Sequence, residues 1–162
     1  MNKKNPHAFV RMSTHYKRGD GVIQSDTRSL EMYIRAAELG DTSARAYGMI
    51  GHYYIEGTVV EQNTSKAIEF YEVAAKKRSV FAHVMLAGFH GENEKVDESI
   101  KHLRVLASAG SQDAVDGLMM AYKEKLLSKE QLTQTLQAFQ ASNDEMKSKD
   151  RDDARAFNEA IA

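Results

Sequence analysis

Histidine is the residue type in this sequence that could bind a metal ion or move protons at neutral pH, and the chain contains six. A metal site needs three or four ligands at one point, and its sequence motifs place pairs of ligands a few residues apart. His83 and His90 are seven residues apart and could share one helical face. However, His90 stands where the other repeats described below have tyrosine, so we predict packing and no metal site. The histidines are His7, His15, His52, His83, His90 and His102.

Other catalytic chemistry lacks support in the sequence as well. The chain contains no cysteine, which excludes a thiol nucleophile, a disulfide framework and a thiolate zinc module. Carboxylates fall mostly at solvated helix positions, such as Glu69, Glu72 and Glu98, with no pair in an environment that we can argue to be dry. The segment Gly19-Asp20-Gly21 follows no predicted strand and is explained by a turn between helices. We predict that the protein is not an enzyme and binds no cofactor.

The elements that position these residues are predicted to be helices. Proline occurs once and strand-like alternation is scarce, which predicts an all-helical chain. Alanine recurs in one column at intervals of 38, 36 and 32 residues, with an apolar residue four positions later and an aromatic residue or histidine eight positions later. These offsets lie on one helical face. The three columns are Ala8, Ala46, Ala82 and Ala114; Met12, Ile50, Leu86 and Leu118; and Tyr16, Tyr54, His90 and Tyr122.

Each repeat is predicted to contain a second helix. A further column holds Tyr33, Tyr71, Leu103 and Leu136, and glycines stand where helices should end. Side chains that can cap a helix N-terminus precede the second helices at Ser25, Asn63, Asp97 and Ser128. Ser128 and Gln131 have the spacing of a capping box. The predicted helices span residues 6–18, 26–39, 43–56, 64–77, 79–90, 97–109, 112–125 and 128–147.

The clearest repeat has the sequence ARAYGMIGHYYIEG over residues 44–57 and KAIEFYEVAA over residues 66–75. This pattern resembles the Sel-one-like repeat (SLR), a relative of the tetratricopeptide repeat. The first repeat matches similarly, the third is weaker, and the fourth departs from the pattern after Tyr122. The resemblance covers about residues 6–140. Similar proteins are adaptors that hold other proteins together, and the resemblance implies such a role here.

We therefore predict an all-α fold, an α/α solenoid of about four helix-turn-helix repeats with a C-terminal helix or tail. The resemblance implies a right-handed superhelix. The small-residue column of the second helices ends in Leu106 and Phe139, so we expect the stack to end at Phe139, because a terminal repeat must cover its own surface. The repeats are predicted at about residues 6–41, 42–78, 79–110 and 111–140, within a domain of residues 1–140 that is followed by a charged C-terminal tail or capping helix at 141–162.

The predicted binding site lies on the inner surface, where the first helices of such superhelices stand side by side. Aromatic, methionine and histidine side chains at exposed helical positions suit peptide recognition because they are large and adaptable. We predict that an extended or helical segment of a partner protein lies along this surface, with Arg18 and Glu56 selecting its charge. The alternative that many of these side chains only pack between repeats stays open. The predicted partner-binding residues are Arg11, Arg18, Tyr47, Met49, His52, Glu56 and His83.

Two other functions stay open. Residues 1–24 carry a net charge of +4 in a chain whose total is −1, so the first repeat could contact nucleic acid as an accessory module, with salt-sensitive affinity. The second alternative is a small-molecule carrier or hydrolase built in the groove.

The sequence contains no feature that predicts contact with a membrane. Its most apolar stretch, Val80 to Phe89, is too short to span a bilayer, and no apolar segment of signal-peptide length follows the N-terminus. We expect a cytoplasmic protein that is a monomer.

Overall fold

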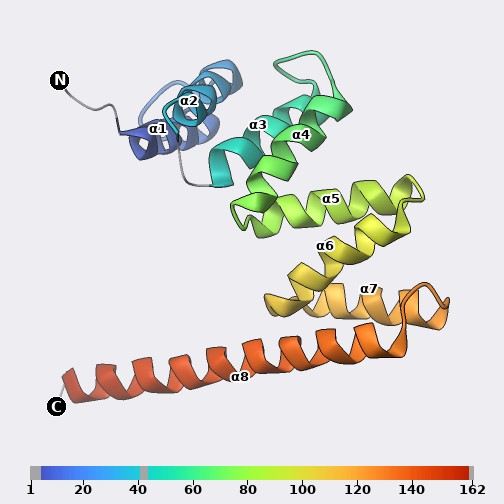
Figure 1. Ribbon diagram of the computed structural model, residues 1–162. Coiled ribbons are helices and arrows are strands. Elements are labelled where there is room, and N and C mark those ends of the chain that lie inside the picture. Colours follow the sequence, from blue (N-terminus) through green and yellow to red (C-terminus); the bar gives the residue numbers. More distant parts are fainter. Residues whose placement is uncertain (1–4, 41–43, 161–162) are drawn as a thin grey trace. The chain divides into compact units, whose positions relative to one another are not determined.

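The computed structural model describes residues 5–40 and 44–160, and for residues 151 and 154–160 it describes the backbone alone. Eight helices and no strand occupy these residues (Figure 1), so the predicted all-α fold of helix-turn-helix repeats is confirmed. The helices are α1 (Pro6–Arg18), α2 (Asp26–Glu38), α3 (Ala44–Glu56), α4 (Thr64–Lys76), α5 (Val80–Glu92), α6 (Val96–Ser108), α7 (Gln112–Lys123) and α8 (Lys129–Ala160).

The helices begin and end at residues whose chemistry suits those positions. The side chains of Ser25 and Asn63 each accept a hydrogen bond from a backbone N–H of the first turn. Ser128 and Gln131 form the predicted capping box, with reciprocal bonds of 3.0 and 3.2 Å between the backbone N–H of each and the side-chain oxygen of the other. Gly57 follows α3 with a φ of 66°, a left-handed conformation that favours glycine. The predicted start and stop signals therefore act as expected at these sites.

The observed helix boundaries lie within two residues of the predicted ones, except at the end of α8. The cap assigned to Asp97 is wrong, because α6 begins at Val96 and Asp97 lies in its first turn, where a carboxylate interacts favourably with the helix dipole. Helix α8 continues to Ala160, since no glycine or proline follows Phe139 to stop it. The division between a repeat domain and a tail at residue 140 stays a prediction.

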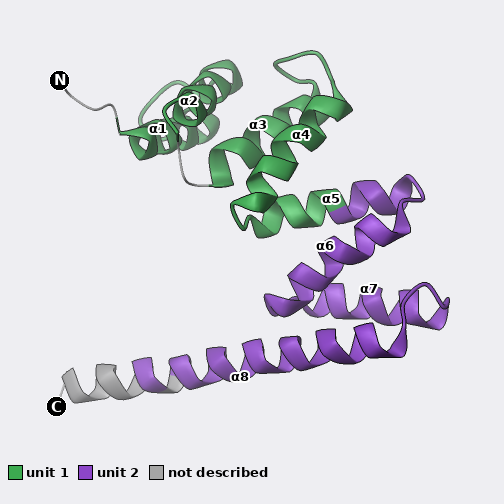
Figure 2. Cartoon of the chain, in the orientation of Figure 1, with its two compact units in different colours: residues 1–86 green, residues 87–162 purple. Residues whose placement is uncertain are grey.

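The first compact unit comprises residues 1–86 (Figure 2). In it α1 packs against α2, α2 against α3, and α3 against α4. One core cluster lies between α2 and α3, and another joins α4 to the beginning of α5. The buried residues of the first are Leu30, Tyr33, Ala36, Ala46, Ile50 and Tyr53, and those of the second are Ala67, Tyr71, Ala74, Ala82 and Leu86.

The second compact unit comprises residues 87–162. Here α6 packs against both α7 and α8, and α7 packs against α8. Phe139 of α8 packs on this core as a half-buried side chain. The buried core residues are Ile100, Leu106, Ala107, Ala114, Val115, Leu118 and Leu127.

The repeated alanine column is buried in three of its four positions. Ala46, Ala82 and Ala114 are at most 2% exposed, whereas Ala8 is exposed. Within the described residues α1 packs chiefly against α2, whereas α3, which carries Ala46, and α7, which carries Ala114, each pack against two helices. Burial of this column therefore depends on packing from both sides.

Two helical glycines make a matched test of this packing. A Cβ at Gly51 would lie 3.0 Å from both the Ala67 carbonyl oxygen and Tyr71 Cε1, whereas a Cβ at Gly88 would meet nothing within 4 Å. Gly51→Ala should lower the free energy of unfolding by about 1 kcal/mol, because overpacking against a backbone atom outweighs the gain in helix propensity. Gly88→Ala should raise the free energy of unfolding by about 0.5–1 kcal/mol.

Urea unfolding followed by circular dichroism measures both changes. Opposite signs are expected for the two substitutions. Equal stabilisation by both would contradict the close approach of α3 and α4 at Gly51.

Candidate functional site

All the predicted partner-binding residues lie in the first compact unit. Arg11 and Arg18 are on α1, and both are exposed. Helix α3 carries Tyr47, Met49, His52 and Glu56, of which Glu56 is exposed and the other three are half-buried. His83 is half-buried on α5. The predicted residues therefore divide into an exposed, charged set and a half-buried set whose contacts decide their role.

Tyr47 and Met49 are held by packing. The Tyr47 hydroxyl donates a 3.3 Å hydrogen bond to the Ala37 carbonyl, and Lys77 Nζ lies 5.3 Å from the centre of its ring. The Tyr47 side chain also packs on the core cluster of α4 and α5, whereas Met49 packs on the cluster between α2 and α3. These contacts favour the packing alternative for both side chains.

A group of four side chains, His52, Glu56, Tyr71 and Phe81, forms the site that we call the His52 cluster. His52 Nε2 lies 3.1 Å from Glu56 Oε1, one helical turn further along α3. The Phe81 ring meets His52 edge-to-face at a centroid distance of 6.1 Å and meets Tyr71 in the same manner at 5.9 Å. Three helices, α3, α4 and α5, therefore bring a histidine–glutamate pair and two aromatic rings together.

Glycine makes this arrangement possible. A Cβ at Gly48 would lie 3.3 Å from Phe81 Cδ1, so the absence of a side chain there lets the phenyl ring approach α3. Gly51 does the same for the Tyr71 ring. The two glycines reduce the helix propensity of α3, and the ring contacts offset that cost.

The His52 cluster contains two buried polar atoms without a hydrogen-bond partner among the described residues, Tyr71 Oη and His52 Nδ1. Burial of the Tyr71 phenol raises its pKa to about 12, and the negative charge of Glu56 adds to this effect. Tyr71 is 2% exposed, so its ring is part of the core while its hydroxyl is left without an acceptor.

Phe81 was not among the predicted site residues. In the structure its side chain is 42% exposed. It stands one position before the alanine column, where the other repeats have His7, Arg45 and Asp113. A large aromatic side chain in an otherwise polar column is the sequence signal that could have indicated it. On the same helix Val80 and Val84 are 55% and 51% exposed, so the three side chains form an exposed apolar strip of α5.

His83 lies on α5 but has a different environment from His52. Burial lowers the pKa of its imidazole, and a hydrogen bond with the Ala75 backbone acts in the opposite direction. His83 is thus inclined to the neutral form by its surroundings.

The basic character of the first repeat is reduced by an ion pair. Lys17 Nζ lies 3.1 Å from Asp26 Oδ1 and 5.1 Å from the centre of the Tyr53 ring. Although burial opposes the charged form, the hydrogen bond to Asp26 leaves the pKa of Lys17 raised. Lys3 and Lys4, which also contribute to the predicted positive charge, lie outside the described residues. Of the basic residues in 1–24, Arg11 and Arg18 are therefore the ones that the structure describes as exposed and without an ion pair in the described part of the chain.

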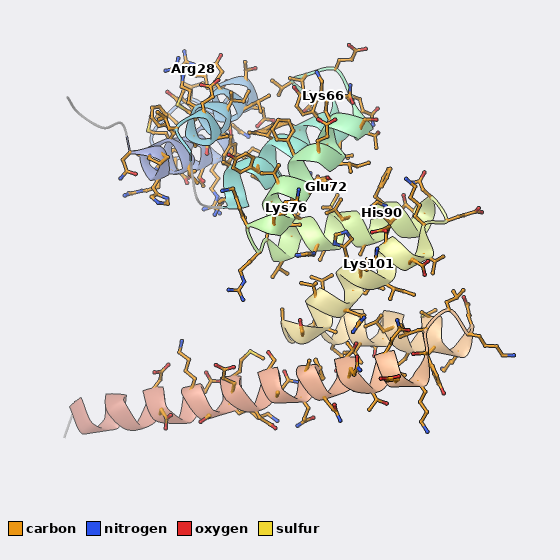
Figure 3. All side chains as sticks on the ribbon, in the orientation of Figure 1. Arg28, Lys66, Glu72, Lys76, His90 and Lys101 are labelled. Carbon is orange, nitrogen blue, oxygen red and sulfur yellow. The ribbon has the colours of Figure 1, made fainter. Side chains whose placement is uncertain are left out.

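The histidines do not assemble into a metal centre in the part of the chain that the structure describes. His90 of α5 (Figure 3) stacks on His102 with a centroid distance of 5.7 Å and an interplanar angle of 6°. No group of three or more histidine, aspartate or glutamate side chains among the described residues could hold a metal ion. No described helix is long and apolar enough to cross a membrane.

The alkaline pH dependence of stability tests the buried Tyr71 phenol. Its folded pKa of about 12 lies above the ordinary value of 10.0, so its contribution to stability is complete below pH 10 and is lost as pH rises towards 12. Tyr71→Phe should therefore make the fall in the free energy of unfolding shallower between these pH values. At neutral pH Tyr71→Phe should not destabilise the fold, because the hydroxyl has no described partner.

Urea unfolding at a series of pH values measures this effect. Tyr122→Phe is the control, because Tyr122 is 39% exposed. Alkaline slopes that are identical in Tyr71→Phe and wild type would show that the phenol is not held in a buried environment.

Residues 7–41 and 44–79 match the family model of the Sel1 repeat. The chain is similar to a Sel1 repeat protein from Oxalobacter formigenes, with 21% identity and a TM-score of 0.70 over 88% of this chain and 59% of that one. It is also similar to a protective antigen of uropathogenic Escherichia coli strains that displays an SLR fold, with 21% identity and a TM-score of 0.71 over 87% of this chain and 31% of that one.

The chain thus spans less than two thirds of the length of either solved protein, and both likenesses concern the fold. No curated protein matches the sequence. The repeat matches and the helix-turn-helix architecture agree with the columns of small and aromatic residues that the sequence repeats. The chain is therefore a helical-repeat protein that contains two Sel1 repeats, at residues 7–41 and 44–79.

Proposed function

We propose that the protein is an interaction adaptor that binds a segment of a partner protein at the His52 cluster and the adjoining apolar strip of α5. Proteins built of Sel1 repeats generally mediate interactions between proteins. The predicted surface consisted of Arg11, Arg18, Tyr47, Met49, His52, Glu56 and His83. Of these residues, the proposal uses His52, Glu56 and Arg18, whose side chains are at least partly accessible to a partner.

The exposed Phe81 ring is the observation that carries this proposal. A phenylalanine that is 42% exposed, between Val80 and Val84, leaves apolar surface in contact with water. Aromatic side chains at the centre of a protein interface contribute much of its binding energy when a partner covers them. We infer that an apolar side chain of the partner packs against this strip.

Polar groups at the edge of the strip supply orientation. The His52 imidazole and the Glu56 carboxylate lie 3.1 Å apart and are both partly accessible, so they can bond to the backbone or side chains of a bound segment. Arg18 is exposed one residue beyond Lys17, whose own charge is paired with Asp26. Arg18 and Glu56 present opposite charges, which favours a partner whose charges are arranged in the complementary order.

The proposed mechanism is binding without a chemical step. The carboxylate of the His52 cluster belongs to Glu56, and it contacts His52, whose ring also packs against Phe81. The arrangement resembles an interface rim beside an apolar centre, and it offers no nucleophile with an activating base.

Capture of partners from a lysate of the source cells tests the proposal. The bait carrying His52→Ala and Phe81→Ala should retain a specific partner about tenfold less than the wild type, because it removes the apolar centre and one end of the polar pair. Tyr47 is left intact because its hydrogen bond and core contacts make its removal a test of folding.

Met120→Ala is the matched control, since Met120 is an apolar residue that is 63% exposed in the second compact unit. It should leave the captured set unchanged. Equal retention by all three baits, each with native helical content, would refute the placement of the site. A captured set that disappears after nuclease treatment would instead support the nucleic-acid accessory function.

A further inference from the structure

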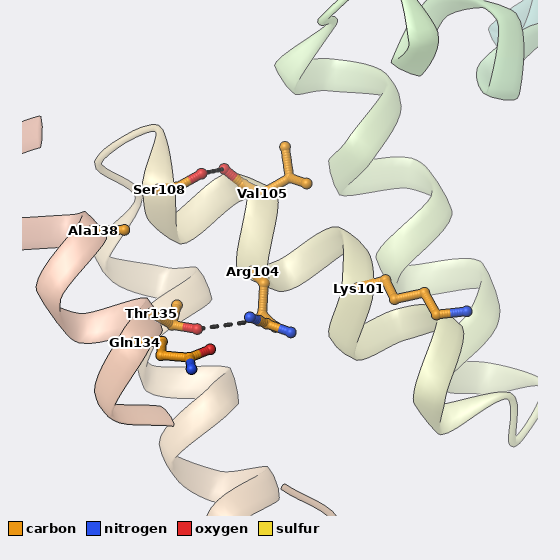
Figure 4. Close-up of a pocket in the computed structure, with 7 residues that line it drawn as sticks. All are labelled: Lys101, Arg104, Val105, Ser108, Gln134, Thr135 and Ala138. Carbon is orange, nitrogen blue, oxygen red and sulfur yellow. Dashed lines mark hydrogen bonds between the residues drawn. The ribbon is translucent and has the colours of Figure 1, made fainter. Parts of the chain in front are cut away.

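The second compact unit contains a groove between α6 and α8 that does not share any residue with the His52 cluster (Figure 4). Its volume is about 350 Å³. Five of the seven lining residues are polar or cationic, and two are aliphatic. The lining residues are Lys101, Arg104, Val105, Ser108, Gln134, Thr135 and Ala138.

Arg104 is held in place from below by a buried hydroxyl. Its Nε donates a 3.2 Å hydrogen bond to Thr135 Oγ1, and Thr135 is only 4% exposed. The same hydroxyl donates to the Gln131 carbonyl at 2.8 Å, so its orientation is determined on both sides. The guanidinium is therefore attached to α8 through one nitrogen, which leaves its terminal nitrogens as donors towards the groove.

The charge of Arg104 has no carboxylate partner among the described residues. Lys101, the other cation of the lining, is already paired, with its Nζ 2.7 Å from Glu98 Oε1. Figure 4 shows the Lys101 side chain extending away from Arg104, Thr135 and Gln134. The Arg104 guanidinium is half-buried, and its bond to Thr135 is to a neutral hydroxyl. An anion that accepts hydrogen bonds from its terminal nitrogens would therefore bind favourably.

The aliphatic residues of the groove indicate which chemical group is attached to the anion. Val105 is 44% exposed and Ala138 is also exposed, so both leave apolar surface beside Arg104. The Ser108 hydroxyl donates to the Val105 carbonyl at 2.8 Å and retains the capacity to accept. The groove therefore combines one unpaired positive charge with apolar surface suited to a short methylene chain.

We propose that this groove is a second recognition site, in which Arg104 binds the carboxylate of an acidic side chain of a protein partner while Val105 and Ala138 contact its methylene groups. A carboxylate matches a single guanidinium in charge and planar geometry. A phosphate group carries close to two negative charges, of which Arg104 alone would balance one, and the other lining cation, Lys101, already pairs with Glu98. The Gln134 amide donates to Glu130 at 3.4 Å and so contributes no additional charge.

Nuclear magnetic resonance titration of the full chain tests the site, with butyrate as the probe. Butyrate should produce saturable shifts of the Arg104 Nε–H and of the Ser108 and Thr135 amides. Butyramide, which has the same chain without the charge, should not. Arg104→Gln should weaken butyrate binding by about tenfold or more, because it removes the charge-assisted hydrogen bonds.

Two further variants separate this site from general electrostatic attraction and from loss of folding. Lys101→Gln removes a lining cation that is already paired, and it should change the affinity for butyrate by less than about twofold. Arg104→Lys keeps the charge but loses the planar fork, and it should show intermediate affinity. The spectrum of Arg104→Gln without ligand is the control for folding. In that spectrum the amide signals of Leu106 and Leu118 in the core should keep their wild-type positions.

Several results would overturn the proposal. These are the absence of saturable shifts with butyrate, equal shifts with butyramide, and equal weakening by Lys101→Gln and Arg104→Gln. Tighter binding of inorganic phosphate than of butyrate at the same residues would overturn the assignment to a carboxylate. Because the groove shares no residue with the His52 cluster, the His52→Ala, Phe81→Ala variant should bind butyrate normally.

Discussion

Close approach between short helices is the constraint on which the rest of this structure depends. Seven of the eight helices that the structure describes are 12 or 13 residues long, a length at which an isolated helix is marginal in water. Their stability must come from packing, and the contact positions are occupied by side chains small enough to let the next helix approach. Ala36, Ala46, Ala67, Ala74 and Ala82 are all fully buried. A bulky residue at any of these positions would hold two helices apart.

The same constraint creates the candidate site. Gly48 and Gly51 lie at packing positions of α3, and their neighbours are the rings of Phe81 and Tyr71. Because α3 presents no side chain at these points, an aromatic ring from each of two other helices lies directly on its surface. Tyr71 is buried by this arrangement, whereas Phe81 stays partly exposed beside His52. The requirement for helix packing and the exposure of an aromatic surface therefore have one structural origin.

Charge is distributed between the two compact units in different ways. In the first, Lys17 is paired with Asp26 and Glu56 lies beside His52, so the exposed surface of the His52 cluster is an apolar strip with polar edges. In the second, Arg104 is attached to a neutral hydroxyl and keeps its charge available. One chain thus carries two surfaces of different chemistry, as expected for a repeat protein in which each repeat contributes its own exposed side chains.

The sequence by itself determined the helical architecture, because alanine, aromatic and glycine residues recur at fixed offsets and each offset has a local physical meaning. The capping box of Ser128 and Gln131 and the glycine that ends α3 depend on neighbouring residues alone, so they could be predicted. The end of α8 was predicted less well, since no local residue stops that helix.

Only the tertiary structure decided which of the predicted partner-binding residues pack against the core and which have side chains exposed to solvent. Tyr47 and Met49 lie on the same helix as His52, but their contacts come from segments distant in the sequence, such as Ala37 and Lys77. Phe81 and Arg104 acquire their roles in the same way, through Gly48 and Thr135 on other helices, and helical periodicity carries no information about those contacts.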